Sequence, residues 1–451
     1  RLRAAGIWHL AGPADIVAYL SSYEEAQRAI DGVLNQGSEG TGQSANVEII
    51  SLASIAEDSS QTVKAVNSTL YDALKSLASD IHLETTPGGL TVKYRIDGVL
   101  CHVGQIGGLD MAEQVISRLK VMSELDIAER RVPQDGRFKI SVNNREIDFR
   151  VSIMPSLFGE DAVLRVLDKQ SLADQMKSLR LETLGFDAPT VEMMRKLAQE
   201  PYGMLLVTGP TGSGKSTTLY AAISEVNNGQ DKIITIEDPV EYMLPGVLQI
   251  PVNEKKGLTF ARGLRSILRH DPDKILVGEI RDAETAQIAV QAALTGHLVY
   301  TTVHANSVFD VIGRFAHMGV DTYSFVSALN GILAQRLVRK ICEHCAEPYQ
   351  PDHQLMLDSG LDPDKVSDFT FRLGRGCGHC RGTGYKGRKA LAEILKLNDT
   401  LRELIISRAP VSQLKEAARK AGMRSLRDIA ISTVRSGQTT LQEINRVTFV
   451  S

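Results

Sequence analysis

Apolar positions near the start of the chain recur at helical spacing. They run from Ile16 to Leu34 and include Tyr19, Leu20 and Val33, a pattern that predicts an amphipathic helix. The stretch that follows, QGSEGTGQSAN at 36–46, is polar and rich in glycine and serine, as flexible linkers are. We therefore expect residues 1–46 to be the end of an N-terminal module followed by a linker. Because residue 1 is arginine and not methionine, we also expect the sequence to start inside a longer protein.

The next part of the chain changes from helical to strand periodicity. A helical stripe at 63–77 is followed by alternating segments, and the clearest hairpin spans 137–154. Side chains alternate between the two faces of a strand. The hairpin's apolar residues therefore share one face, and Arg137 and Arg150 point to the other. We predict a small α+β domain over residues 47–175, with two arginines on an open sheet face.

Beyond residue 176 short apolar strands alternate with helical segments. This alternation, with strands that are apolar throughout, predicts a mainly parallel sheet covered by helices on both faces, and hence an α/β core over 176–341. Functional residues of such folds gather at the carboxyl ends of the strands. From residue 391 to 451 the pattern is helical, which predicts a helical C-terminal region. The predicted strands are 204–208, 233–237, 275–277 and 298–303.

A phosphate-binding sequence follows the first of these strands. It reads G-x-x-x-x-G-K-S from Gly209 to Ser216 and precedes a segment compatible with a helix, which is the context that the motif requires. Backbone N–H groups of such a loop surround a β-phosphate at a helix N-terminus. Lys215 would reach the β- and γ-phosphates, and the Ser216 hydroxyl would hold Mg²⁺. The expected ATP-binding residues are Gly209, Pro210, Thr211, Gly212, Ser213, Gly214, Lys215, Ser216 and Thr217.

Polar residues also follow the other predicted strands. Hydrolysis of a γ-phosphate needs a metal, a carboxylate that orients water, and cations that offset the charge on the phosphoryl oxygens. We assign Glu279 to polarising water, Glu237 and Asp238 to water-mediated Mg²⁺ binding or water positioning, and His304 to sensing the γ-phosphate. Taken singly, each is equally a helix cap or a hydrogen-bonded loop residue. His297, before the last strand, carries the same ambiguity.

Four of the five cysteines form two C-x-x-C pairs in the pattern C-x2-C-x31-C-x2-C. Four thiolates in such turns match a closed tetrahedral zinc site of structural type. Free thiols or a redox pair are the alternatives. We predict a zinc-stapled subdomain over 342–390, with Cys342, Cys345, Cys377 and Cys380 as ligands.

Composition narrows the possible classes of function. The formal net charge is -3, which gives no electrostatic attraction to nucleic acid. No apolar run approaches the roughly 18 residues of a membrane-spanning helix, and a signal-peptide pattern is lacking. We expect a cytoplasmic protein without a transmembrane segment of its own, and no nucleic-acid partner.

The order of the motifs resembles the secretion ATPases of the GspE/PilB type, which power type II secretion and type IV pilus assembly. Gly278 stands where a Walker B strand usually carries aspartate, and this departure points to the same family. The matching motifs are the phosphate loop, TIEDPVEY at 235–242, ILVGEIRD at 275–282, ALTGHLVYTTVHAN at 293–306 and, upstream, SDIHLE at 79–84, YRIDGVL at 94–100 and PQDGR at 133–137.

This resemblance implies a RecA-like P-loop ATPase domain preceded by a smaller PAS-like α+β domain. It also implies a homohexamer in which the smaller domain of one subunit closes over the nucleotide of another. Arg137 and Arg150 are carried over as phosphate contacts, and so are Arg265, Arg269 and Arg281.

The function implied is ATP-driven assembly of a pilus or pseudopilus. The motor would lie at the inner membrane through a platform protein and a membrane-associated assembly partner. A retraction ATPase of the same superfamily, a nucleic-acid or DNA-transfer motor and a non-hydrolysing nucleotide switch are the alternatives. The residues do not separate type II secretion from pilus assembly.

Overall fold

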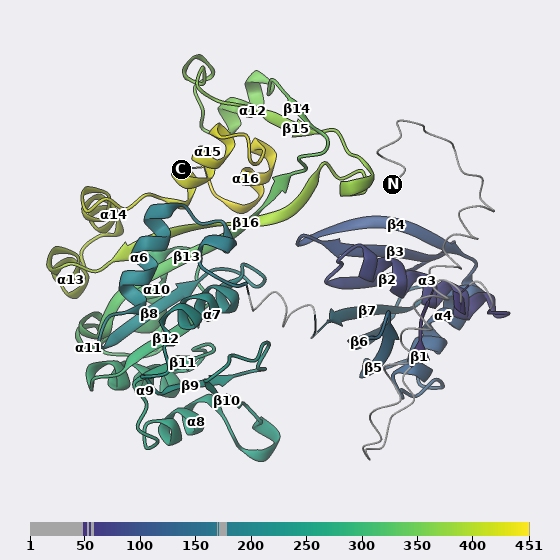
Figure 1. Ribbon diagram of the computed structural model, residues 1–451, viewed down its shortest axis with the longest axis horizontal. Coiled ribbons are helices and arrows are strands. Elements are labelled where there is room, and N and C mark those ends of the chain that lie inside the picture. Colours follow the sequence, from purple (N-terminus) through teal and green to yellow (C-terminus); the bar gives the residue numbers. More distant parts are fainter. Residues whose placement is uncertain (1–47, 52–53, 56–57, 169, 171–177, 451) are drawn as a thin grey trace, which may run out of the picture. The chain divides into compact units, whose positions relative to one another are not determined.

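The computed structural model describes residues 48–51, 54–55, 58–168, 170 and 178–450 (Figure 1). The helix expected at 16–34 and the linker at 36–46 lie outside the described residues. The chain divides into two compact units, Arg1–Gln170 and Ser171–Ser451, and each is considered by itself.

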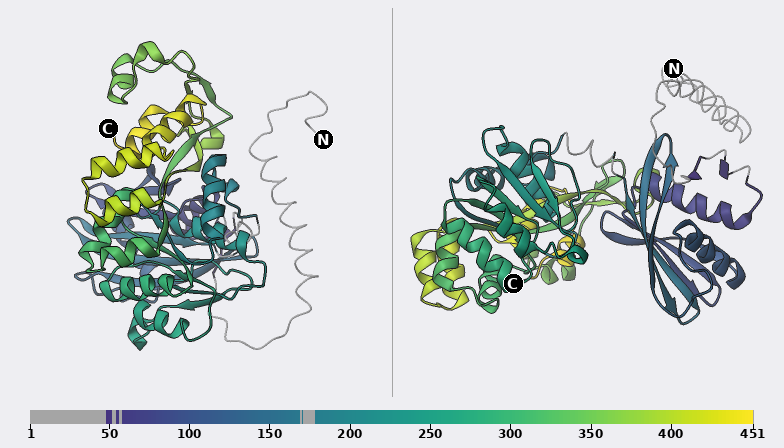
Figure 2. Two further views of the ribbon diagram at one scale, coloured as in Figure 1. Left: turned by 90° about the vertical axis from the view of Figure 1, so that its left-hand side faces the viewer. Right: turned by 90° about the horizontal axis from the view of Figure 1, so that it is seen from below.

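The first unit contains a seven-stranded sheet in the order β1-β5-β6-β7-β2-β3-β4. The short β1 pairs parallel with β5, and the other neighbours are antiparallel. Helix α4 packs on the sheet beside α3, so both helices lie on the same face (Figure 2, right). This confirms the predicted α+β class. The elements are β1 (Glu48–Ile49), α3 (Gln61–Lys75), β2 (Asp80–Thr86), β3 (Gly89–Ile96), β4 (Val99–Gly107), α4 (Leu109–Met122), β5 (Gln134–Val142), β6 (Arg145–Ser156) and β7 (Gly159–Leu167).

The second unit contains another seven-stranded sheet, in the order β10-β9-β11-β12-β8-β13-β16. All neighbours are parallel except β13 and β16, which are antiparallel. The mainly parallel α/β core is therefore confirmed. The strands are β8 (Gly203–Thr208), β9 (Ile233–Glu237), β10 (Leu248–Pro251), β11 (Lys274–Val277), β12 (Leu298–Val303), β13 (Leu329–Ile341) and β16 (Tyr385–Lys396).

Helices cover both faces of this sheet, and strand periodicity explains how. On β8, Met204 and Leu206 enter the core formed with α8, α9, α10 and α11, whereas Leu205 and Val207 enter the core formed with α6 and α7. Alternate side chains of one buried strand thus serve two cores. These helices are α6 (Ala188–Ala198), α7 (Lys215–Val226), α8 (Phe260–Ile267), α9 (Ala283–Leu294), α10 (Val308–His317) and α11 (Thr322–Ala328).

An excursion between β13 and β16 carries the cysteines and a small two-stranded sheet, and helices follow β16 (Figure 1). The predicted C-terminal helices are present. Residues 391–396, however, belong to β16, because this strand pairs with β13 through Lys396. The elements are β14 (Ala346–Pro348), α12 (His353–Asp358), β15 (Arg372–Gly374), α13 (Asp399–Ile406), α14 (Val411–Lys420), α15 (Leu426–Arg435) and α16 (Leu441–Val447). None of the helices in the described parts of the chain is both long and apolar enough to cross a bilayer.

Candidate functional site

The phosphate loop joins β8 to the N-terminus of α7, as the motif predicts. Gly209 and Gly214 have φ values of 147° and 86°, a backbone region that side chains disfavour. Lys215 folds back over the loop, where its Nζ donates to the carbonyl oxygens of Gly209 (3.0 Å) and Pro210 (3.1 Å). Burial lowers the pKa of Lys215, and the nearby Arg336 guanidinium lowers it further. The loop therefore offers N–H groups and one cation to an anion at a helix N-terminus.

Glu279 lies just after β11, at the same sheet edge as the loop. Its Oε1 accepts from Nη2 of Arg281 (2.5 Å), and its Oε2 lies 3.6 Å from Nε2 of His304. Oε2 is buried and has no hydrogen-bond partner among the described residues. One oxygen of this side chain is thus held by Arg281, and the other lies beside the His304 ring without a hydrogen bond.

Glu237, at the end of β9, is buried, with 4% of its surface exposed. Its carboxylate accepts hydrogen bonds from Tyr220 of α7, from Thr235 Oγ1 (2.5 Å) and from Gln249 Nε2 (3.2 Å). The next residue, Asp238, is exposed. Glu237 therefore connects β9 to the helix that follows the phosphate loop, and Asp238 is the carboxylate of this pair that reaches the surface.

The two candidate histidines lie at opposite ends of β12. His304 follows the carboxyl end, beside Glu279. Burial lowers the pKa of His304, and the positive charge of Lys215 lowers it further, so its ring is neutral near pH 7. His297 precedes the strand, and its Nδ1 lies 3.0 Å from the Ala292 carbonyl at the end of α9. Of the two histidines, only His304 lies at the sheet edge that carries the phosphate loop.

The three arginines of the second unit that the resemblance assigns to phosphate contacts are exposed. Arg281 contacts Glu279 and lies 3.9 Å from Asp238, so it bridges two carboxylates at the site. Arg265 pairs with Glu284 of α9 at 2.5 Å, and Arg269 donates to the Arg265 carbonyl at 3.0 Å. Arg281 is therefore the arginine of this group that contacts Glu279.

In the first unit Arg137 and Arg150 are directly opposite each other on β5 and β6. Arg165 of β7 is opposite Arg150, and the same row continues to Asp80 of β2. Nε of Arg165 lies 3.0 Å from Oδ1 of Asp80. Like charges at directly opposed positions are destabilising, so this row of three arginines favours an anion on the open face. Arg165 and Asp80 were not assigned to this site from the sequence. The alternation of a buried Leu164 and an exposed Arg165 is the signal that could have placed Arg165 on the open face.

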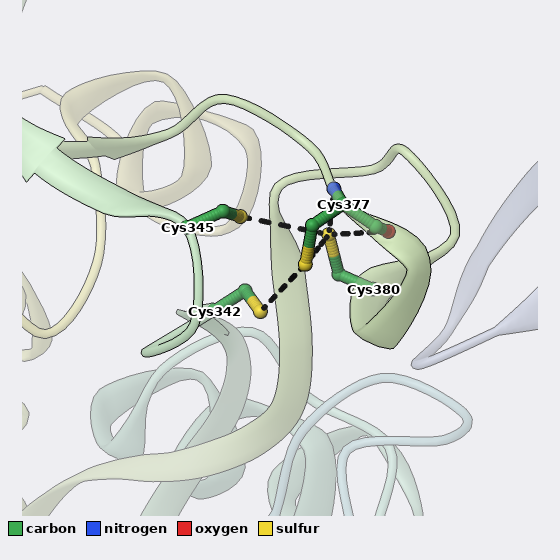
Figure 3. Close-up of side chains that lie close together, drawn as sticks. All are labelled: Cys342, Cys345, Cys377 and Cys380. Carbon is green, nitrogen blue, oxygen red and sulfur yellow. Dashed lines mark hydrogen bonds between the residues drawn. The ribbon is translucent and has the colours of Figure 1, made fainter. Parts of the chain in front are cut away.

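The four cysteines converge from the two ends of the excursion between β13 and β16 (Figure 3). All four Sγ atoms lie within 4.8 Å of one another. The distances are 3.9 Å for Cys342–Cys377, 3.7 Å for Cys345–Cys380 and 3.7 Å for Cys377–Cys380. A tetrahedron with Zn–S bonds of about 2.3 Å has S···S edges of about 3.8 Å. The donor set and its spacing therefore fit a zinc ion.

Gly278 explains why the usual Walker B aspartate is missing. A Cβ atom there would lie 3.2 Å from the Ile236 carbonyl oxygen and 3.3 Å from the Glu237 Cα atom. The backbone of β9 therefore leaves little room for a side chain.

We expect Gly278→Asp to lower the free energy of unfolding by about 1–3 kcal/mol, the usual cost of overpacking. Calorimetric melting of the variant measures this cost. Gly313→Ala is the matched control, because the corresponding Cβ in α10 meets open space. Equal melting temperatures for wild type and Gly278→Asp would contradict the steric explanation.

Comparison with known proteins agrees with this arrangement. Residues 55–446 match the family described as Type II/IV secretion system protein. The type IV pilus assembly ATPase PilB of Myxococcus xanthus is 46% identical over 391 residues, which cover 86% of this chain and 68% of that protein. Type II secretion system protein E of Pseudomonas aeruginosa is 46% identical over 392 residues, covering 87% and 76%.

Two solved structures share the fold. The pilus retraction motor PilT with bound ADP is 27% identical with a TM-score of 0.54, and the match covers 84% of this chain and 95% of that one. The ATPase DotB of Legionella pneumophila is 20% identical with a TM-score of 0.61, covering 89% and 99%. The family match spans most of the sequence and includes every candidate site residue, so the chain belongs to the Type II/IV secretion system protein family.

Proposed function

We propose that this chain is a motor ATPase that converts ATP hydrolysis into mechanical work for assembly of a type IV pilus or a type II secretion pseudopilus. The observation that carries this proposal is the convergence of the phosphate loop, Glu279 and His304 at one sheet edge. Two relatives, a type IV pilus assembly ATPase and a type II secretion system protein E, support assembly as the task of the motor.

The site residues divide the chemistry of hydrolysis between them. Lys215 and the loop N–H groups bind the β- and γ-phosphates, and the free oxygen of Glu279 polarises the attacking water. His304, neutral and next to Glu279, contacts the γ-phosphate. Asp238 orders water at the carboxyl end of β9, and Glu237 fixes that end relative to α7.

The ion that accompanies the nucleotide requires an oxygen ligand at the loop. The Ser216 hydroxyl, in the first turn of α7, and the exposed Asp238 carboxylate supply oxygens of the kind that Mg²⁺ prefers. Gly278 offers no carboxylate. Mg²⁺ would therefore bind through Ser216 and the phosphates, where it would offset their negative charge.

A complete site also needs cations that are supplied when subunits assemble. We propose a homohexamer in which Arg137 and Arg150 of one subunit approach the γ-phosphate bound by a neighbour. Arg265, Arg269 and Arg281 complete the cationic surroundings of the phosphates. The hexamer would work on the cytoplasmic side of the inner membrane, held there by a platform protein and a membrane-associated assembly partner.

The proposal is tested by measuring ATP turnover per subunit over a wide range of protein concentration. We expect low activity in dilute protein, an increase of about tenfold or more as rings form, and loss of that increase in Arg150→Ala. Arg130→Ala is the control, because Arg130 pairs with Glu113 of α4 (2.9 Å) on the helix-covered side of the sheet. Constant activity in protein shown to be monomeric would contradict the completion of the site by assembly.

Retraction is the second candidate function, favoured by the structural match to PilT. Assembly and retraction motors differ in the effect that their deletion has on surface fibres. Deleting an assembly motor leaves no surface fibres, whereas deleting a retraction motor leaves an excess of them.

A further inference from the structure

Strand β13 carries two buried polar residues directly beside the phosphate loop. Ala334 of β13 is the register partner of Thr208, the last residue of β8. Gln335 and Arg336 therefore continue past the point where the loop begins. Their exposed fractions are 1% and 8%, so neither is a surface residue.

The Gln335 amide joins the loop to the helix that follows it. Its Nε2 donates to the Ser213 carbonyl at 2.7 Å, and its Oε1 accepts from Thr218 Oγ1 of α7 at 2.8 Å. Contact with the loop is close, because a Cβ at Gly214 would lie 2.9 Å from this Nε2. One side chain thus holds the loop backbone at Ser213 and the Thr218 side chain of α7.

Arg336 reaches in the other direction. Its Nη1 donates to the Gln335 carbonyl at 3.0 Å, and its Nη2 donates to the Asn306 carbonyl at 2.8 Å. Asn306 is two residues beyond His304. Burial lowers the pKa of Arg336, and the nearby Glu393 carboxylate of β16 opposes that shift. A Cβ at Gly209 would lie 3.3 Å from Nη1. A buried guanidinium has lost hydration, and Arg336 offsets part of that cost through its bonds to the two carbonyl oxygens, which fix the backbone at Asn306.

We propose that Gln335 and Arg336 are positioning residues, Gln335 for nucleotide binding by the phosphate loop and Arg336 for the placement of His304 during hydrolysis. The inference rests on the proposed use of this loop for ATP. It assigns separate roles to two adjacent residues, because their side chains fix different loops.

The Gln335 half is tested by ATP affinity. We expect Gln335→Leu to raise the Kd for ATP about ten- to a hundredfold, since it leaves the buried Ser213 carbonyl without its donor. Thr218→Val, a change of similar shape that removes only one contact of the same amide, should raise Kd by a smaller factor. If Gln335→Leu does not fold, the ATP affinity of Thr218→Val still tests the role of Gln335.

Val338→Ala is the control for general loss of stability. Val338 is fully buried on the same strand, in the core that contains residues of α10 and α11. We expect its Kd to match wild type even if its melting temperature falls. Wild-type affinity in folded Gln335→Leu and Thr218→Val, or an equal loss of affinity in Val338→Ala, would overturn the role of Gln335.

The Arg336 half is tested by the split between kcat and Kd. Arg336→Met should lower kcat about tenfold or more, with Kd changed less than threefold. Arg336→Lys should recover part of kcat, because a single ammonium group reaches one carbonyl where the guanidinium reaches two. Unchanged kcat, or equal losses in kcat and affinity, would overturn this role. If wild-type protein binds ATP without hydrolysing it, the motor proposal fails while the Gln335 test still stands.

Discussion

Replacing Glu279 by glutamine should reduce ATP turnover about 10²–10⁴-fold, the range expected for loss of general base assistance, while leaving the Kd for ATP within about threefold of wild type. Glu279 carries a buried carboxylate oxygen that has no hydrogen-bond partner among the described residues, and Gly278 before it supplies no second carboxylate. Glutamine keeps the shape of the side chain and removes the charge that polarises water. The measurement is steady-state turnover at saturating ATP and Mg²⁺, paired with equilibrium nucleotide binding.

Glu416→Gln is the matched control for this substitution. Glu416 is an exposed glutamate of α14, where it pairs with Lys420 at 2.8 Å, and its neutralisation should leave turnover within about twofold. Undiminished turnover in Glu279→Gln would remove Glu279 from its proposed role. A large loss of ATP affinity would instead assign it to binding.

We propose that the tetracysteine cluster binds zinc, and we expect its removal to disorder the excursion between β13 and β16. The described regular structure of that excursion is limited to three-residue strands, short 3-10 turns and the six-residue helix α12, too little to be stable alone. Structural zinc contributes about 10–16 kcal/mol in zinc-finger peptides. We therefore expect the metal to supply most of the stability of this segment.

Chelation, or the variant Cys380→Ser, should release about one zinc ion per chain, the stoichiometry of a four-thiolate site. It should also speed proteolysis between Cys345 and Cys377 about tenfold or more, as expected when local unfolding becomes favourable. Zinc analysis and timed proteolysis measure the two effects. Cys101→Ser is the control, because Cys101 lies on β4, outside the cluster. Protein that contains no zinc as isolated, or a protease pattern that chelation leaves unchanged, would contradict the structural role.

The hairpin at 137–154 shows what strand periodicity can predict, namely which side chains are buried and which are exposed. Alternation placed Phe138 and Phe149 inside and Arg137 and Arg150 outside, and the register bears this out. The same reasoning missed the long strand β13. Ile332 and Leu333 follow Leu329 at three and four residues, and Leu337 follows Leu333 at four, which is the spacing of a helix and not the alternation of a strand. The reasoning therefore placed Gln335 and Arg336 in no element and in no site.

Chain order also hides contacts between distant residues. Gln335 and Thr218 are 117 positions apart, and Asp80 and Arg165 are 85 apart. Each contact depends on which strands are neighbours in the folded sheet, β8 with β13 and β2 with β7. Sequence periodicity predicts which face of a strand is buried, but it does not predict which strands pair with it.

Features that depend on local order could be predicted from the sequence: the phosphate loop between strand and helix, the carboxylates and His304 after later strands, the C-x-x-C turns and the alternation within each strand. Which of these groups meet follows from the folded sheet, which places His304 rather than His297 beside Glu279 and Gly278 against the backbone of β9. Periodicity is a property of residues that are neighbours in the sequence, whereas packing and hydrogen bonding between strands depend on the spatial order of the strands in the sheet.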